Sequence, residues 1–321
     1  MRIGLLTDSL SALGFDEMLD AAAGLGIREL EFATGGWSEA PHLDVAAVLS
    51  DKATSERFLG ALRERELSIS ALNINGNQLH PVSGQRVDET VRATVRLAGL
   101  LGVETVVLMS GLPGGAAGDS TPNWITTSWP PETQTILDYQ WNEVALPYWR
   151  GLAELGREAG VRFAVEMHGS QLVYNSATLL RLRDEVGDVV GANLDPSHPM
   201  WMGVDPRLLA RELDGAIHHV HMKDARLEPS VAFVTGVLDT QPVDAARSRA
   251  WNYVTLGHGY PGGQQFWAQF LADLRASGYD GVLSIEHEDV GVDALEGVRQ
   301  SVELLRPIVP TLPPSWVPAA V

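Results

Sequence analysis

The sequence contains no cysteine among its 321 residues. Disulfide bonds and thiolate nucleophiles are therefore excluded, and any bound metal must be held by oxygen and nitrogen ligands. Basic residues are also scarce, because 23 lysines and arginines stand against 41 aspartates and glutamates, giving a net charge of −18. A surface of that sign repels nucleic-acid phosphates and anionic lipids, so we expect neither as a partner. A phosphorylated substrate stays open, since a pocket can be locally positive.

Long apolar runs are missing as well. The apolar stretch at residues 3–6 is too short for a signal peptide, and nothing downstream approaches a membrane span. These absences predict a cytoplasmic protein. The 45% of hydrophobic residues and 20% of charged residues are typical of a globular protein with a large core.

Short β-like runs alternate with longer amphipathic stretches, which is the pattern of βα units on a parallel sheet. We expect strands near 2–7, 28–33, 67–73, 103–109, 161–167, 190–195, 216–222 and 281–287. We expect helices near 15–25, 44–65, 86–101, 143–159, 176–187, 205–213, 264–277 and 292–306. Eight strand–helix pairs favour a closed barrel over an open sheet.

An open, doubly wound sheet would carry a glycine-rich G-x-G-x-x-G turn after its first strand. Here the first strand is followed by Thr7-Asp8-Ser9-Leu10, without that motif. We therefore predict an α/β fold of the (β/α)8 TIM-barrel type as one catalytic domain over residues 1–306, followed by a proline-rich tail over 307–321.

Two connections are longer than a barrel needs, one at 110–142 after the fourth strand and one at 224–256 after the seventh. Both are rich in aromatic residues, and both rise from the C-terminal face, where barrel enzymes keep their active sites. Long loops there act as lids or substrate walls. Packing of the aromatic side chains against the barrel or a partner subunit is an equal alternative.

Acidic and imidazole side chains collect at the ends of the last four strands. Period-two alternation predicts which of them face inward. The inward set is Glu166 and His168 on the fifth strand, Asp195 on the sixth, His219, His221 and Lys223 on the seventh, and Ser284, Glu286 and Glu288 on the eighth.

One ligand from each of these strands gives Glu166, Asp195, His221 and Glu286. Three carboxylates and one imidazole suit a divalent ion such as Mn²⁺, with Mg²⁺, Co²⁺ or Zn²⁺ as alternatives. Burying three carboxylates without a cation would be very unfavourable. Any one of these acids alone is more often a helix cap or an ion-pair partner, so the prediction depends on all four converging.

The other histidines have different expected roles. His80 follows the third strand on the active face and is placed to line the pocket. His219 lies deeper than His221 and is expected to be a hydrogen-bonded core histidine. His218 and His287 point outward, and we assign them no function.

Several motifs in residues 161–288 resemble those of the sugar phosphate isomerase/epimerase superfamily, the xylose isomerase-like barrels that include inosose dehydratases and ketose 3-epimerases. They are Asn193-Leu194-Asp195-Pro196-Ser197-His198, His219-Val220-His221-Met222-Lys223-Asp224, Ser284-Ile285-Glu286-His287-Glu288, and Glu166-Met167-His168 followed by Val173-Tyr174-Asn175. The N-terminal half matches in pattern more than in motif.

The resemblance implies the same four metal ligands, with Glu166 and Glu286 flanking the substrate as the acid/base pair. His168 joins this catalytic set. The substrate contacts are expected from His198, Lys223, Arg226 and His80. The epimerases have an arginine a few residues after the seventh-strand histidine, and Arg226 is the nearest equivalent, although its spacing differs.

The expected reaction is removal of a proton next to the carbonyl of a sugar, with the metal stabilising the resulting enediolate. Return of the proton isomerises or epimerises the sugar. Loss of a β-substituent makes the enzyme a lyase, as in an inosose-type dehydratase or in catalytic subunits that cleave C-glycosides of 3-keto sugars.

Rival hypotheses come from other classes. A zinc hydrolase of the endonuclease IV type needs more histidine ligands and a basic surface, which the charge of −18 opposes. A non-enzymatic sugar-binding or scaffold barrel stays open. The expected partners are a small sugar or glycoside and either identical subunits or a second, different subunit.

Overall fold

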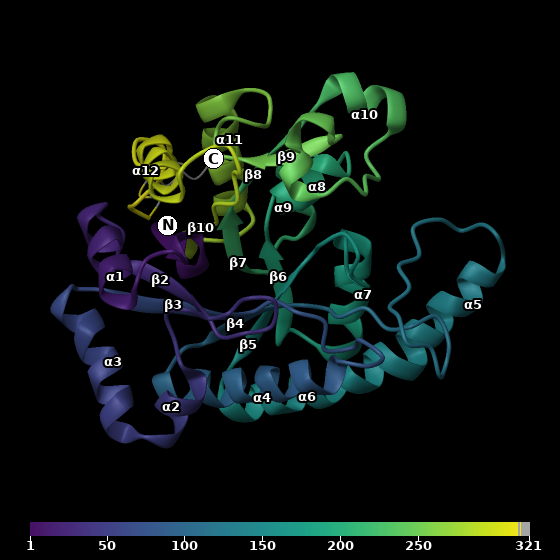
Figure 1. Cartoon of the computed structure of the whole chain (residues 1–321), viewed down its shortest axis with the longest axis horizontal. Coiled ribbons are helices and arrows are strands. Elements are labelled where there is room, and N and C mark those ends of the chain that lie inside the picture. The colour runs from purple at the N-terminus through teal and green to yellow at the C-terminus, as the bar shows by residue number, and fades with distance from the viewer. Residues whose placement is uncertain (314, 316–321) are drawn as a thin grey trace, which may run out of the picture.

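Eight parallel strands close into a barrel in the computed structural model, which describes residues 1–313 and 315 (Figure 1). The barrel strands are β1 (Arg2–Leu6), β2 (Glu29–Ala33), β3 (Ser68–Ile74), β4 (Thr105–Met109), β5 (Arg162–Glu166), β6 (Val190–Leu194), β7 (Ile217–Met222) and β10 (Val282–Ile285). Each strand pairs with its neighbours in sequence order, and β1 pairs with β10 to complete the ring. The predicted (β/α)8 barrel is confirmed.

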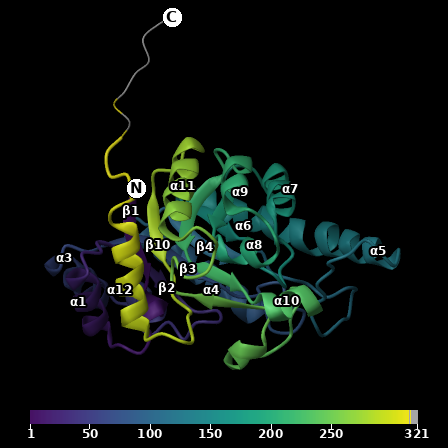
Figure 2. The same ribbon diagram turned by 90° about the horizontal axis from the view of Figure 1, so that it is seen from above.

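The main helices lie outside the strands (Figure 2). They are α1 (Phe15–Gly24), α3 (Lys52–Glu64), α4 (Gly84–Leu101), α6 (Leu146–Ala159), α7 (Ser176–Val186), α9 (Pro206–Glu212), α11 (Gly263–Ala276) and α12 (Ala294–Leu305). Apolar residues at helical spacing face the barrel, as with Val91, Val95 and Ala98 of α4, all fully buried. Because a parallel sheet is covered on its outer face, the strands themselves are almost entirely apolar on that side.

The helix expected over residues 44–65 is in fact two helices, α2 (Val45–Ser50) and α3. The backbone of Asp51 between them is extended, at φ −128° and ψ 112°. Its carboxylate accepts hydrogen bonds from the backbone N–H groups of Ala53 and Thr54 and so caps α3. The apolar periodicity continues across this break, which explains why the sequence pattern predicted one helix.

The connection after β4 contains structure of its own. It includes α5 (Glu132–Asp138), and a π-helical turn, Tyr139–Ala145, joins α5 to α6. Both ribbon views show α5 projecting beyond the barrel (Figures 1 and 2). Trp141 is buried beneath the guanidinium of Arg181, while the indole of Trp129 is 75% exposed. Part of the aromatic content therefore packs the insertion onto the barrel, and part faces outward.

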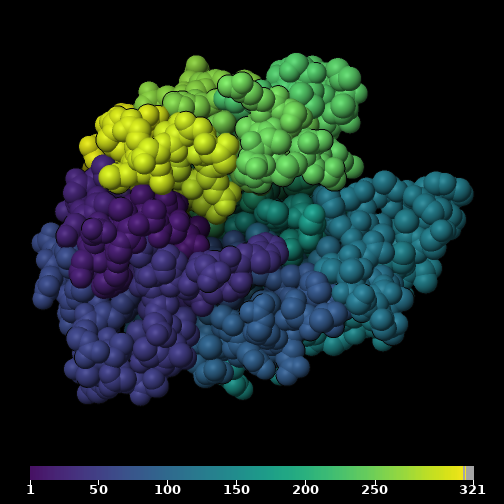
Figure 3. All heavy atoms as spheres, viewed as in Figure 1, coloured from purple at the N-terminus to yellow at the C-terminus, as the bar shows by residue number. Residues whose placement is uncertain are grey.

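The connection after β7 forms an antiparallel hairpin, β8 (Asp224–Leu227) with β9 (Trp251–Val254), and also carries α10 (Pro229–Thr235) and the 3₁₀ turn Val243–Ser248. The buried carboxylate of Asp224 accepts hydrogen bonds from backbone N–H groups of residues 225, 257, 259 and 260. These bonds tie the two ends of the insertion to each other. In the space-filling view, a hollow separates this segment (green) from the one with α5 (blue-green) (Figure 3).

The first and last parts of the described chain meet at the seam of the barrel. The amino group of Met1 lies 2.5 Å from Asp280 Oδ1 and donates to the carbonyl of Pro310 at 3.0 Å. Arg275 also binds the carbonyls of Pro310 and Leu312. The C-terminal part of the predicted proline-rich tail, at 314 and 316–321, lies outside the described residues. None of the helices in the described part is long and apolar enough to cross a bilayer.

Candidate metal centre

The four predicted ligands come together at the C-terminal rim of the barrel. Glu166 is the last residue of β5, Asp195 follows β6, His221 lies near the end of β7 and Glu286 follows β10. One ligand atom from each lies within 4.8 Å of those of the others. The first three are buried, and the Glu286 side chain is 11% exposed. Since parallel strands end at one rim, four consecutive strands can supply one ligand each.

The donor atoms of this cluster fit a divalent cation. Asp195 Oδ2, His221 Nδ1 and Glu286 Oε2 are buried and make no hydrogen bond of regular geometry within the described part of the chain, although an ionisable neighbour lies within 3.1 Å of each. His221 Nδ1 lies 2.9 Å from Glu286 Oε2 and 3.3 Å from Glu166 Oε2. Buried polar atoms without partners are costly. A cation shared by three carboxylate oxygens and one imidazole nitrogen would satisfy all of them.

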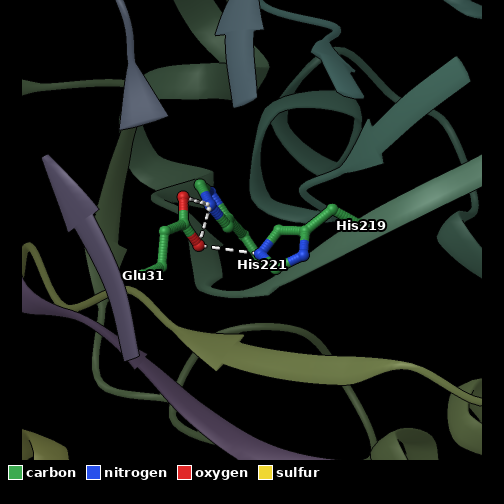
Figure 4. Close-up of side chains that lie close together, drawn as sticks. All are labelled: Glu31, His219 and His221. Carbon is green, nitrogen blue, oxygen red and sulfur yellow. Dashed lines mark hydrogen bonds and ion pairs between the residues drawn. The ribbon is translucent and has the colours of Figure 1, made fainter. Parts of the chain in front are cut away.

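The orientation of His221 is fixed from behind by Glu31, a residue of β2 (Figure 4). His221 Nε2 lies 3.0 and 3.2 Å from the two oxygens of Glu31. A proton on Nε2 makes this nitrogen the donor and leaves Nδ1 as a lone pair that faces the other carboxylates. A carboxylate behind a histidine ligand is a common way to set its tautomer and raise its basicity.

Glu31 is surrounded by hydrogen-bond donors. Besides His221, its oxygens accept from His219 Nε2 at 2.7 Å, Ser284 Oγ at 2.7 Å and Asn73 Nδ2 at 2.8 Å. Burial alone would raise the pKa of Glu31, but the imidazoles of His221 and His219 hold it well below its ordinary value. Because these donors occupy both oxygens, the first cluster is a better candidate for holding a cation than the group of Glu31, His219 and His221. His219 is the hydrogen-bonded core histidine that the sequence predicted.

Glu166 is held by three polar side chains. Asn193 and Asn75 donate to its Oε2 at 2.8 and 3.3 Å, and His198 Nε2 lies 3.1 Å from its Oε1. Burial acts to raise the pKa of Glu166, but the hydrogen bonds and charges of His198 and His221 bring it well below the usual range. Glu286 differs, because burial raises its pKa despite the neighbouring Lys223 and His221.

His198 links Glu166 and Asp195 of the cluster to the insertion after β7. It belongs to the short helix α8 (Ser197–Trp201), and its Nε2 is 3.1 Å from Asp195 Oδ2. The hydroxyl of Tyr253, on β9, is 2.9 Å from His198 Nδ1. Burial would lower the pKa of His198, but Asp195 and Glu166 raise it to about 9. Tyr253 had no assigned role in the sequence analysis, because only the folded hairpin brings it here.

His168 lies against His198, with ring centroids 4.1 Å apart, and its Nδ1 contacts the carbonyl of Gly169. Burial and the neighbouring His198 lower the pKa of His168 to about 4, so it is neutral near pH 7.

Lys223 is the positively charged side chain of the cluster. Its Nζ lies 2.5 Å from Glu288, 3.4 Å from Glu286 and 3.9 Å from Asp195. It also stands 4.3 Å from the ring centroid of Tyr253. Burial would lower the pKa of Lys223, but these carboxylates raise it well above its ordinary value. The residue therefore presents a positive charge beside the candidate ligands.

Two predicted substrate contacts lie elsewhere. Arg226 forms an ion pair with Glu228 at 2.7 Å and lines a cavity beside α10, where Phe233 and Tyr260 also lie. His80 Nδ1 accepts hydrogen bonds from the backbone N–H groups of Val82 and Ser83, at the start of α4. The structure thus brings His198, Lys223 and His168 to the cluster, but not Arg226 or His80.

A cavity of about 240 Å³ opens beside Glu286 at the ends of β1, β2, β3 and β10. Its lining includes Asp8, Trp37, Ser38 and Asn75. None of these was predicted from the sequence, since each comes from a loop of the N-terminal half, where no motif stands out.

Comparison with known proteins places this geometry in a family. A family model described as a xylose isomerase-like TIM barrel matches residues 19–308. The uncharacterized protein YfiH of Bacillus subtilis (strain 168) is 47% identical over 310 residues, covering 95% of this chain and 98% of that protein.

Solved structures share the fold at low identity. The probable 3-DHS dehydratase AsbF from Bacillus anthracis has a TM-score of 0.68 at 20% identity, covering 95% of this chain and 99% of that one. The IolI protein with a bound zinc atom has a TM-score of 0.68 at 17% identity, covering 96% and 98%.

Proposed function

This chain belongs to the xylose isomerase-like TIM-barrel family, and from that premise we propose that it is a divalent-metal-dependent isomerase or epimerase that moves a proton next to the carbonyl of a sugar. One observation carries the proposal: three carboxylates and an imidazole from four strands converge, and three of their inward atoms make no hydrogen bond of regular geometry among the described residues. Such a set suits a cation that binds substrate oxygens.

Glu166, Asp195, His221 and Glu286 are the proposed ligands. Mn²⁺ is our choice, with Mg²⁺, Co²⁺ and Zn²⁺ as alternatives, because oxygen donors dominate the set and a nitrogen donor completes it. When bound, such an ion would supply Lewis-acid stabilisation of negative charge on the substrate oxygens. The zinc atom in the IolI structure is in keeping with a metal in this fold.

The proton transfer is assigned to the two glutamates. Glu166 and Glu286 both approach His221 Nδ1, so they flank the same space. One carboxylate removes the proton next to the carbonyl, and the other, in its protonated form, delivers a proton of its own. Delivery to the opposite face of the same carbon gives epimerisation. Delivery to the former carbonyl carbon, with loss of the proton of the adjacent hydroxyl, gives isomerisation.

The remaining groups of the cluster would bind and orient the substrate. Lys223 is placed to donate a charge-assisted hydrogen bond to a substrate oxygen. His198 is held between Glu166, Asp195 and the hydroxyl of Tyr253, which makes its position rigid. The neutral His168 behind it joins the proposed catalytic set.

A lyase reaction is the second candidate. Elimination begins with the same proton removal, and a protonated group such as Lys223 beside Glu286 can assist departure of a β-hydroxyl. AsbF, a probable dehydratase, has the same fold. We further propose a cytoplasmic location. We also propose an assembly with identical or different subunits, and size-exclusion chromatography tests this assembly.

Solvent exchange tests the proposed function. The Mn²⁺-loaded protein is incubated in D₂O with ketoses, aldoses and 3-keto-glycosides, and deuterium at the substrate carbons is followed by NMR. We expect exchange that Glu166→Gln and Glu286→Gln reduce at least about a hundredfold, as for loss of a general base. Glu228→Gln, in an ion pair outside the cluster, is the matched control.

Sugar binding without exchange would favour a non-enzymatic binding barrel. Exchange that survives both glutamine substitutions and a chelator would contradict the proposal.

A further inference from the structure

The cavity beside Glu286 is lined by side chains that the proposed proton transfer does not use. Asp8 lies in the 3₁₀ turn Thr7–Leu10 after β1, Trp37 and Ser38 follow β2, and Asn75 follows β3. Glu286 and Glu288 form the side toward the metal centre. A substrate held by the cluster at one end would extend into this space, because the cavity and the cluster share Glu286.

Several lining groups are hydrogen-bond acceptors that have no hydrogen-bond donor among the described residues. Asp8 Oδ1 and Asn75 Oδ1 are buried and have no partner among residues 1–313 and 315. The amide nitrogen of Asn75 donates to Glu166, which fixes its carbonyl oxygen on the other side. Native structures rarely leave such atoms unpaired, so each points to a donor supplied by water or by a ligand.

The acidic side chains of the lining outnumber its basic ones. Its described lining contains the carboxylates of Asp8, Glu286 and Glu288, and it contains no lysine or arginine. Lys223 is outside this lining and forms ion pairs with Glu288 at 2.5 Å and with Glu286 at 3.4 Å. His287 also lines the cavity. An anionic group placed beside Asp8 would meet acceptor oxygens and no cationic side chain of the lining.

An aromatic surface stands at the rim. The indole of Trp37 is 60% exposed and belongs to the cavity lining. An exposed tryptophan presents a large apolar face with a polar edge, which suits the C–H face of a polyhydroxylated molecule. The position of its backbone is constrained, because Gly36 has φ +81° and a Cβ there would meet the carbonyl oxygen of Asn75 at 2.2 Å.

We propose that this cavity is the subsite for the part of the substrate away from the reacting carbons, and that it selects neutral hydroxyl groups over phosphate or carboxylate. Asp8 and Asn75 accept hydrogen bonds from the hydroxyls, and Trp37 packs against the carbon chain. This inference rests on the proposed function, since it takes the reacting end to be held by the metal centre. It narrows the substrate class to uncharged sugars or polyols.

Calorimetry with matched probes tests the subsite. The Mn²⁺-loaded protein is titrated with D-fructose, D-tagatose, D-xylose and myo-inositol, and with D-fructose 6-phosphate as the charged counterpart of the first. We expect at least one neutral probe to bind, and D-fructose to bind about tenfold or more tightly than its phosphate ester. Asp8→Ala is expected to weaken binding of the neutral probe about tenfold, as for loss of a hydrogen bond to a charged group.

Two further variants sharpen the test. Asp8→Lys reverses the charge and is expected to reduce or invert the preference against the phosphate ester. Asp16→Asn, at a 72% exposed carboxylate in the following helix, is the control and is expected to change nothing. Thermal unfolding and Mn²⁺ affinity are measured on every variant, and both are expected to stay close to those of the unsubstituted protein, since Asp8 is not a ligand.

Three results would overturn the subsite: a phosphate ester that binds as tightly as the neutral sugar, Asp8 variants that leave binding unchanged, or no binding of any neutral probe. Deuterium exchange on the same samples separates the two proposals. If exchange depends on the metal but the charged probe is preferred, the subsite is rejected and the proposed function is retained. Absence of both exchange and metal binding rejects the proposed function as well.

Discussion

The network behind His221 gives Glu31 a measurable role at the scale of a single residue. Glu31 accepts hydrogen bonds from His221 Nε2 and so leaves Nδ1 free to face the other ligands. Replacement by glutamine keeps the shape but removes the charge and introduces an amide donor that opposes the imidazole N–H. We expect Glu31→Gln to weaken Mn²⁺ binding by about 10–100-fold, the usual cost of losing such a partner. Competition with a chelator measures the change.

Glu29→Gln is the control on the same strand. Glu29 lies two residues earlier and pairs with Arg2 at 2.5 Å. Equal Mn²⁺ affinities for the Glu31 and Glu29 variants would show that Glu31 does not set the state of His221.

The same residue marks a limit of sequence reasoning. Glu166, Asp195, His221 and Glu286 could be predicted to meet because each ends an expected strand and faces inward by alternation. Glu31 sits in the middle of β2, where an acid between two apolar neighbours has no spacing signal. Its partners lie 188 and 190 positions away in the chain, so only the closed barrel brings them together.

At the scale of elements, His218 makes β7 sensitive to acid. It lies at a register shift between β6 and β7 and, contrary to the outward orientation expected from alternation, lines a pocket with Arg162 and His219. Its Nδ1 lies 3.0 Å from the carbonyl of Phe163, and a Cβ at Gly191 would meet its ring. Burial lowers the pKa of His218 from 6.5 to about 4, with Arg162 and Arg183 adding positive charge nearby. The unfolded chain therefore binds a proton at a higher pH than the folded chain does.

The sign of the effect follows from that order. The contribution of the uncharged His218 to the free energy of unfolding is fully present above pH 6.5 and is lost as the pH falls toward 4. We expect the unfolding free energy to fall by about 1–3 kcal/mol more in the unsubstituted protein than in His218→Gln between pH 7 and pH 4. Urea unfolding at both pH values measures this difference. Parallel curves for the two proteins would contradict the assignment.

Elements were predictable where apolar periodicity alone decides them. All eight barrel strands and most helices lie where the pattern indicated them. The break at Asp51 was missed because the apolar face continues across it, whereas the β8–β9 hairpin depends on Asp224 binding backbone groups more than 30 residues away. Local sequence does not encode such a contact, and so neither the hairpin nor the delivery of Tyr253 was foreseen.

For the whole molecule, the metal is expected to act as a stabilising ligand. A cation that binds only the folded chain adds about 4 kcal/mol of stability at a thousandfold excess over its dissociation constant. We therefore expect chelation to lower the melting temperature, and added Mn²⁺ to restore it. Differential scanning fluorimetry follows both. Glu286→Gln is expected to lose most of the shift, and a full shift in that variant would place the stabilising ion elsewhere.

The closure of β1 on β10 has a consequence for how the protein matures. Three of the four proposed ligands are in place once the seventh strand has docked, but the last comes from the segment that seals the ring. A nascent or truncated chain short of that segment holds an incomplete chelate. High-affinity binding of the ion would thus begin only when β10 pairs with β1, so ion binding would report that the barrel has closed.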